Sequence, residues 1–281
     1  MTIHNGFDTI KLQGSENLNA VEKYGKHLDE FRLMDDDFMS QVFDRNIEAT
    51  QLVVDILLSD KKLKVKSVTS QREYKSAEGR TIKLDIYAED ESGIPIDIEI
   101  QRADKGAAPK RARFHSSMLD TRMLSKGEDF SELKETYVIF ITENDVLKKG
   151  LPIYHIERTV KETAEWFGDG THILYVNGNY TGQDAIGQLM HDFRCKKASE
   201  MHYEPLAQKV RYFKENEGGR ETMCKIVEDL REEAREEARN QIAIRLLQGG
   251  KLSVEEIASA AELPLREVEK IKKDLDKKKS S

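Results

Sequence analysis

Two acidic residues stand in strand-like sequence where apolar residues are expected, and they are the clearest sign of chemistry in the chain. Asp85 and Glu99 lie within 82–101, where isoleucine and leucine alternate with polar residues on both sides of a polar turn. This two-residue period predicts a β-hairpin. If the turn centres on Ser92, Asp85 faces Glu99, about 4.5–5.5 Å away between Cβ atoms. Two carboxylates so close repel each other unless a cation lies between them, so the pattern predicts a divalent metal site.

Gln101 extends this site, because it follows Glu99 by two residues and therefore shares its face of the strand. Its amide can hydrogen-bond water or phosphate but carries no positive charge. Carboxylate oxygens suit Mg²⁺ or Mn²⁺, and such metals support phosphodiester hydrolysis by activating water and relieving charge on phosphoryl oxygens. The bland alternative is the exposed polar face of a two-stranded ribbon. Asp97 likewise is either a supporting acid or a solvent-exposed strand residue.

A basic segment follows the hairpin directly: seven basic residues accompany only two acidic ones between 100 and 126. Pro109 fits the first turn of a helix that we expect to end near Leu124, with Gly127 as its cap. Such a helix beside a carboxylate site can hold nucleic-acid phosphates. The alternative is a solvated face, or internal pairing with the acidic cluster. The candidate phosphate contacts are Lys110, Arg111, Arg113 and His115.

The order of these segments resembles the PD-(D/E)XK nuclease superfamily, and within it the nuclease family transposases, relatives of the recombination-promoting nucleases. The resemblance covers roughly residues 30–230. In that branch the last motif residue is commonly glutamine rather than lysine. The likeness implies an α/β fold with a restriction-endonuclease-like mixed sheet flanked by helices. It rests on the motif Asp85, thirteen residues, Glu99-Ile-Gln101, and on the segments 110–120, 137–145 and 189–193.

The resemblance also implies roles for individual residues. Asp85 and Glu99 would bind Mg²⁺ or Mn²⁺ together with the backbone carbonyl of Ile100. Gln101 takes the place of a lysine that orients water and steadies negative charge. Glu48 lies in the expected first helix, where many superfamily members carry a further catalytic carboxylate, although alone it reads as an ordinary helix residue.

Three parts are expected along the chain. Residues 1–30 are polar and weakly periodic, which predicts a mobile lead-in, and 31–222 form the nuclease-like domain. Residues 223–281 form a helical C-terminal extension. Within the domain the patterns predict helices over 35–58 and 181–194, and strands over 63–73, 137–142 and 172–176.

The C-terminal extension begins with a continuous helix over 223–245 that includes the charged repeat 231–239. A solvated helix is the simplest interpretation; a coiled-coil seam that joins two copies into a homodimer is the alternative. Ser253 and Glu256 fit a capping box. The segment 252–264 resembles a helix-turn-helix, a motif that binds DNA in some proteins and serves as a packing or dimer module in others.

Bulk properties narrow the class of protein. The net charge of −7 argues against a protein that coats DNA generically. No apolar run approaches the length of a membrane span, and the N-terminus lacks a signal-peptide pattern, so no membrane partner is expected. The two cysteines, without metal-type spacing, fit free thiols in the cytoplasm.

Three functions remain as alternatives. The first, implied by the resemblance, is a metal-dependent DNA endonuclease associated with mobile elements or recombination. The second is a catalytically decayed nuclease fold that binds nucleic acid or regulates, which the glutamine and the overall acidity favour. The third is a structural interaction protein that acts through its charged helix.

Overall fold

The computed structural model describes residues 24–75 and 81–279 of the chain. Two compact units are distinguished, one formed by Lys26–Arg220 and the other by Met1–Gly25 with Glu221–Ser281. Of the expected mobile lead-in, residues 1–23 lie outside the described part, whereas 24–30 are helical. That end of the predicted lead-in is therefore wrong: Leu28 is fully buried.

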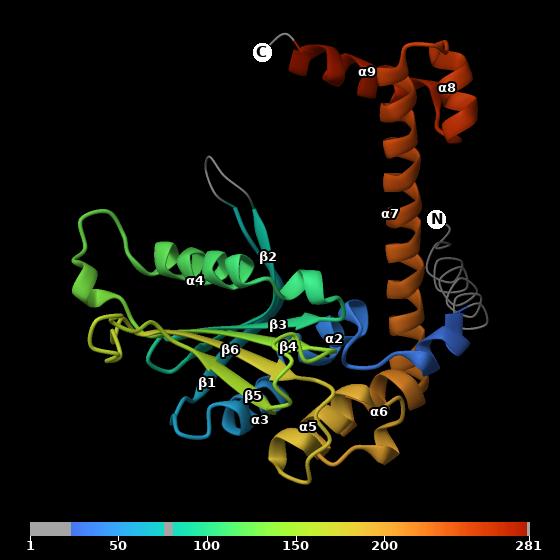
Figure 1. The fold of residues 1–281 in the computed structure, drawn as a ribbon. Coiled ribbons are helices and arrows are strands. Elements are labelled where there is room, and N and C mark those ends of the chain that lie inside the picture. Colours follow the sequence, from blue (N-terminus) through green and yellow to red (C-terminus); the bar gives the residue numbers. More distant parts are fainter. Residues whose placement is uncertain (1–23, 76–80, 280–281) are drawn as a thin grey trace, which may run out of the picture. The chain divides into compact units, whose positions relative to one another are not determined.

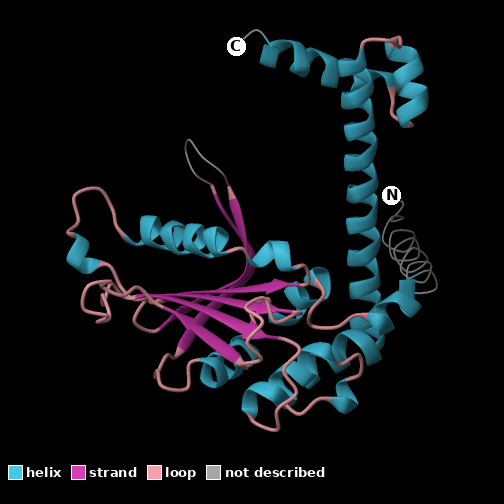
Figure 2. Cartoon of the chain, viewed as in Figure 1, coloured by secondary structure: helices cyan, strands magenta, loops and turns pink. Residues whose placement is uncertain are grey.

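A six-stranded mixed sheet forms the centre of the larger unit, as predicted (Figures 1 and 2). Its strand order is β1-β2-β3-β4-β6-β5. The first three strands are antiparallel, β3, β4 and β6 run parallel, and β5 returns antiparallel at the edge. The strands are β1 (Val65–Tyr74), β2 (Ile82–Asp90), β3 (Pro95–Gln101), β4 (Thr136–Thr142), β5 (Ile153–Ile156) and β6 (Thr171–Asn177).

Helices cover both faces of this sheet (Figure 1). Helix α4 (Pro109–Met123) lies over β4 and β6, and α2 (Asp36–Phe43) and α3 (Ile47–Leu57) pack against β1. Helices α5 (Ala185–Arg194) and α6 (Glu204–Glu215) complete the unit. Beneath α4, Leu119 meets Leu84 and Phe140 in a buried core. Because α4 packs on β4, which adjoins β3, its inner face meets the hairpin.

The predicted single helix over 35–58 is two helices, so that prediction is wrong at its centre. Arg45 has a φ of 53°, which breaks the helical path. Asn46 then begins α3, because its side-chain oxygen accepts from the backbone N–H of Ala49 at 3.2 Å. Asp44 contacts β1, where its carboxylate accepts a hydrogen bond from the backbone N–H of Ser70.

The other predicted elements are present with modest changes of length. Strands β1, β4 and β6 lie where the sequence predicts them. The edge strand β5 is only four residues long, and no pattern in the sequence predicts it. Helix α5 begins later than expected because the Asp184 side chain caps it through the N–H of Gly187. Gly127 does not cap α4, which ends at Met123.

The smaller unit is helical, as expected. Helix α7 (Glu217–Gly249) is continuous through the charged repeat, whose residues 231–238 are exposed. Helices α8 (Val254–Ala261) and α9 (Leu265–Lys279) share a small core with Ala243 of α7. The predicted capping box of Ser253 and Glu256 is present. In the described part of the chain, no helix is long and apolar enough to cross a membrane.

Candidate active site

The hairpin of β2 and β3 has the predicted register, and it brings the two predicted ligands together. Backbone pairing ends at Ile86 and Ile98. Immediately beyond this pair, side chains replace the ladder. The backbone N–H of Asp85 donates to Glu99 Oε1 at 3.1 Å, and the N–H of Ile100 donates to Asp85 Oδ2 at 2.9 Å. The two carboxylates are therefore fixed by the strands themselves.

An irregularity in β1 lies beside this point. β1 pairs with β2 through Ser70–Ile86 and Arg72–Leu84, and between these pairs Gln71 has a φ of 54°. Non-glycine residues rarely adopt this left-handed conformation. The regular backbone pairing of β2 is therefore interrupted near Asp85 on both edges of the strand, towards β1 and towards β3. The backbone N–H and the carboxylate of Asp85 bond to Glu99 and Ile100 instead.

A third carboxylate, Asp97, joins the cluster from β3 and is completely buried. The alternative of a solvent-exposed strand residue is therefore wrong. Asp97 Oδ2 lies 2.8 Å from Nδ1 of His115, which is itself buried on α4. Arg111 Nε donates to His115 Nε2 at 3.3 Å, so the two ring nitrogens of His115 link Arg111 to Asp97. Asp97 Oδ1 has no hydrogen-bond partner among the described residues.

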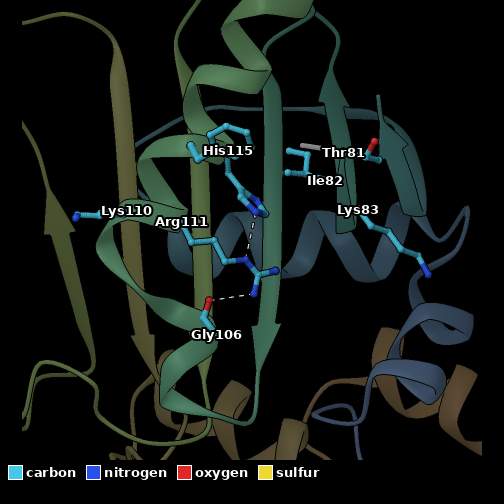
Figure 3. A pocket seen from close by; sticks show the side chains of 8 residues that line it. Thr81, Ile82, Lys83, Gly106, Lys110, Arg111 and His115 are labelled. Atoms are coloured by element: carbon cyan, nitrogen blue, oxygen red, sulfur yellow. Dashed lines mark hydrogen bonds between the residues drawn. The ribbon is translucent and has the colours of Figure 1, made fainter. Parts of the chain in front are cut away.

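Arg111 closes the cluster from the side of α4. Its Nη2 donates to Glu99 Oε2 at 2.5 Å, and its Nη1 donates to Gln101 Oε1 and to the carbonyl of Gly106, both at 3.0 Å. Figure 3 shows the guanidinium extended between Gly106 and His115. Internal pairing is thus what the structure shows for Arg111 and His115.

The four candidate phosphate contacts therefore separate into two kinds. Lys110 and Arg113 are exposed, whereas Arg111 and His115 face the acidic residues. A cavity of about 660 Å³ opens beside this cluster. Lys83, Lys110, Arg111 and His115 contribute to its wall, and none of the described lining residues is acidic (Figure 3). A cationic cavity thus adjoins a carboxylate cluster.

Crowding of carboxylates in a buried place shifts their acidity. Burial, and then the charge of Glu99, raise the pKa of Asp85 to about 7. Burial and Asp97 raise the pKa of Glu99 to about 8, although His115 and Arg111 oppose the shift. The pKa of Asp97 is raised well above its usual value by burial and then by Asp85. The single positive charge of Arg111 does not balance the negative charges that three buried carboxylates would carry, so their pKa values stay raised.

A fourth carboxylate, Asp36 at the start of α2, has an exposed side chain and acts on the cluster through its charge, a role that the sequence interpretation missed. Its charge contributes to the raised pKa of Asp85, and its own pKa is raised by burial and by Asp37. Glu48, the predicted carboxylate of the first helix, lies exposed at the start of α3. None of the described interactions links Glu48 to the cluster. The helix break at Asn46 separates the two residues into different helices.

The donor set fits a hard divalent cation. Asp85, Asp97 and Glu99 provide oxygen ligands of the type that Mg²⁺ and Mn²⁺ prefer. Asp97, Glu99 and His115 also present one ligand atom each within 4.8 Å of one another. The unpartnered Asp97 Oδ1 and the raised pKa values both indicate uncompensated negative charge, which a cation would remove.

Comparison with known proteins agrees with this geometry. The family described as "PD-(D/E)XK nuclease family transposase" matches residues 40–180, a span that contains β2, β3 and α4. The match is shorter than the resemblance over 30–230 and stops before α5. No curated protein and no solved structure matches the chain. A hairpin with Asp85 opposite Glu99-Ile-Gln101, on a mixed sheet flanked by helices, is the arrangement that the family implies, and the chain belongs to the PD-(D/E)XK nuclease family transposases.

Proposed function

We propose that the protein is a Mg²⁺- or Mn²⁺-dependent DNA endonuclease associated with mobile elements or DNA recombination. The observation that carries this proposal is the contact of Asp85 and Glu99 across two adjacent strands, with Asp97 buried beside them. Residues 31–222 act as the nuclease-like domain, and 223–281 act as the C-terminal module. Family membership supports a nuclease; metal use and cleavage are the steps that we add.

Asp85, Glu99 and the backbone carbonyl of Ile100 would hold the metal, which when bound would supply a nucleophilic water and relief of charge on the phosphate. In the reaction, the water oxygen bonds to phosphorus and the bond to one sugar oxygen breaks. The leaving oxygen takes a proton, which gives a phosphate monoester end and a hydroxyl end. Gln101 orients water or phosphate through its amide, and Asp36, rather than Glu48, assists Asp85 from α2.

DNA contact is assigned first to α4, where Lys110 and Arg113 are exposed beside the cavity. Arg111 and His115 contact DNA only where the cavity admits a phosphate. Phosphate contacts of this kind give affinity without sequence preference. Helices α8 and α9 offer a second DNA-binding element. A homodimer formed through 223–245 would bring two sites to one duplex and allow both strands to be cut.

The expected cytoplasmic location rests on cysteine chemistry. Cys195 and Cys224 are buried thiols, which is compatible with a reducing compartment.

A second function, DNA binding or regulation by a decayed nuclease, is favoured by one specific observation. Gln101 replaces the lysine of the wider superfamily, and the guanidinium of Arg111 already neutralises Glu99 Oε2. A site closed in this way would bind nucleic acid near α4 without cutting it. Both functions require the same fold, so only activity separates them.

The test is cleavage of supercoiled plasmid at low salt with Mg²⁺ or Mn²⁺, using the wild type and Asp85→Ala. We expect nicking by the wild type that EDTA and the substitution both abolish, with DNA retention unchanged. DNA retention without cleavage in either metal would favour the decayed nuclease. Cleavage that survives Asp85→Ala would disprove the site, and failure to retain DNA at low salt would favour a structural interaction protein.

A further inference from the structure

The guanidinium of Arg111 is held on three sides by polar groups of the site. Nε contacts His115, Nη1 contacts Gln101 and Gly106, and Nη2 contacts Glu99. These contacts use four of its five N–H groups, so within the described residues one Nη2 N–H has no acceptor. The side chain remains 35% exposed and lines the cavity. Arg111 is thus a cation held in place at the cavity wall, with one N–H group that has no acceptor among the described residues.

Gly106 shows that this arrangement is closely built. A Cβ on Gly106 would lie 1.8 Å from Gln101 Oε1, and 3.5 Å from Nη1 of Arg111. Only a residue without a side chain lets Gln101 approach the turn η1 (Asp104–Ala107) and accept from Arg111. Since Arg111 can only donate, its partner on Gln101 is the oxygen, and the amide NH₂ is turned away from the guanidinium. Gln101 and Arg111 therefore act as one donor unit.

The charges of these residues also connect Gln101 with Arg111. Gln101 shares the face of Glu99 but is neutral, whereas Arg111 brings a positive charge within hydrogen-bond distance of both residues. The cavity beside them is lined by Lys83 and Lys110 as further cations. An anion with several oxygens, such as a phosphate group, fits this cavity, because a guanidinium N–H forms a strong charge-assisted hydrogen bond with a phosphate oxygen.

We propose that Arg111 supplies from α4 the positive charge that Gln101 lacks, and that it binds the phosphate group that is cleaved. This inference rests on the proposed nuclease function and assigns one of its catalytic residues. As water attacks phosphorus, negative charge grows on the non-bridging oxygens, and this remaining N–H of Arg111 donates to one of them. His115 also positions Arg111 through its contact with Nε, and Asp97 positions His115 in turn.

The first test compares cleavage rates of the wild type, Arg111→Met and Arg111→Lys. We expect Arg111→Met to lower the rate by about 10²–10³-fold, the usual cost of one electrostatic donor to a transition state. Arg111→Lys keeps the charge but loses the planar set of donors that contacts His115, Gln101 and Glu99, and we expect about a tenfold loss. Lys126→Met, in the exposed loop after α4, removes the same charge outside the site and should leave the rate unchanged.

Rescue distinguishes charge supply from structural support. Adding Gln101→Lys to Arg111→Met returns a cation to the Glu99 face, and we expect it to recover at least about tenfold of the lost rate. Gly106→Ala should lower the rate about tenfold while Arg111 is still present, because the added Cβ displaces Gln101. Full activity of Arg111→Met, or no recovery in the double variant, would overturn the proposal.

A binding measurement separates failure of this inference from failure of the nuclease function. Inorganic phosphate is titrated calorimetrically into the protein with Mn²⁺ present. We expect the wild type to bind phosphate at least about tenfold more tightly than Arg111→Met. Equal affinity overturns the role of Arg111 even if the wild type cuts DNA. An Arg111-dependent affinity in a protein that does not cut would retain Arg111 as the phosphate ligand and disprove cleavage instead.

Discussion

Two clusters of histidine and carboxylate in the α/β unit look alike in composition and differ in how their carboxylates are bonded. Asp192 is buried between His191 and His202, which are 46% and 42% exposed. Its Oδ1 accepts from the backbone N–H of His202, and its Oδ2 accepts from that of Tyr203, both at 2.8 Å. Asp192 therefore fastens the start of α6 to α5.

The cluster of Asp97, Glu99 and His115 is the opposite case. Asp97 leaves Oδ1 without a partner in the described part of the chain, and the pKa of Glu99 is raised by burial and by Asp97 although Arg111 donates to Glu99. A satisfied carboxylate serves structure, whereas crowded, unsatisfied carboxylates store charge for a ligand. The two clusters contain the same residue types, so the active site is distinguished by a buried carboxylate oxygen that lacks a hydrogen-bond partner among the described residues.

The largest expected effect is on cleavage by Glu99→Gln. This substitution keeps the size of the side chain but removes a charged metal ligand. We expect the rate to fall by roughly 10³-fold or more, since a bound metal contributes several kcal/mol to the transition state. Plasmid nicking under single-turnover conditions measures it. A loss smaller than tenfold would place the metal elsewhere and remove the contrast between the clusters.

Asp192→Ala should damage stability and spare chemistry. Two buried backbone N–H groups lose their acceptor, which should lower the free energy of unfolding by about 2–4 kcal/mol. Urea unfolding measures this loss. Cleavage per folded molecule should equal that of the wild type. Loss of cleavage with unchanged stability would mean that the second cluster, not the first, carries function.

The raised pKa of Glu99 predicts a pH-dependent cost in the metal-free protein. A carboxyl whose folded pKa lies above its ordinary value of 4.5 gives stability below that pH and loses it as pH rises towards about 8. Relative to Glu99→Gln, the wild type should therefore lose up to about 1.4 kcal/mol per pH unit in this window. Urea unfolding in EDTA at pH 5 and pH 8.5 tests it. A difference that stays constant would show that Glu99 is already ionised at low pH.

The smallest expected effect separates two carboxylates of neighbouring helices. Asp36→Asn should lower cleavage about tenfold, because the charge of Asp36 acts on Asp85 through space. Glu48→Gln should change it less than about twofold, as expected for an exposed surface residue. The reverse order would restore the assignment made from sequence.

The comparison also explains what the sequence can predict. Period-two alternation and turn residues fix the hairpin and its register, so the meeting of Asp85 with Glu99 follows from local pattern. Strand β4 follows in the same way from a short, continuous apolar run. Asp97 also shares the Glu99 face by that pattern, and only its burial decides between supporting acid and surface residue.

The remaining features of the site depend on packing between distant segments. Arg111 points towards Glu99 only because α4 packs on the sheet beside β3. A basic helix recognised from sequence therefore does not reveal whether its arginine pairs with DNA or with an acidic residue of the same chain. The separation of Glu48 from Asp36 follows from a local signal. Asn46 is a favourable N-cap, and it divides the predicted helix between the two acids.

The most direct test of the account is calorimetric titration of Mn²⁺ into the metal-free protein at pH 8.5, which lies above the raised pKa values of Asp85 and Glu99. Wild type and His202→Ala should bind the ion with equal affinity, whereas Asp85→Asn should bind at least about 100-fold more weakly. That result would assign the metal to the buried carboxylates of β2 and β3. No binding by the wild type, or binding that depends on His202 and not on Asp85, would contradict it.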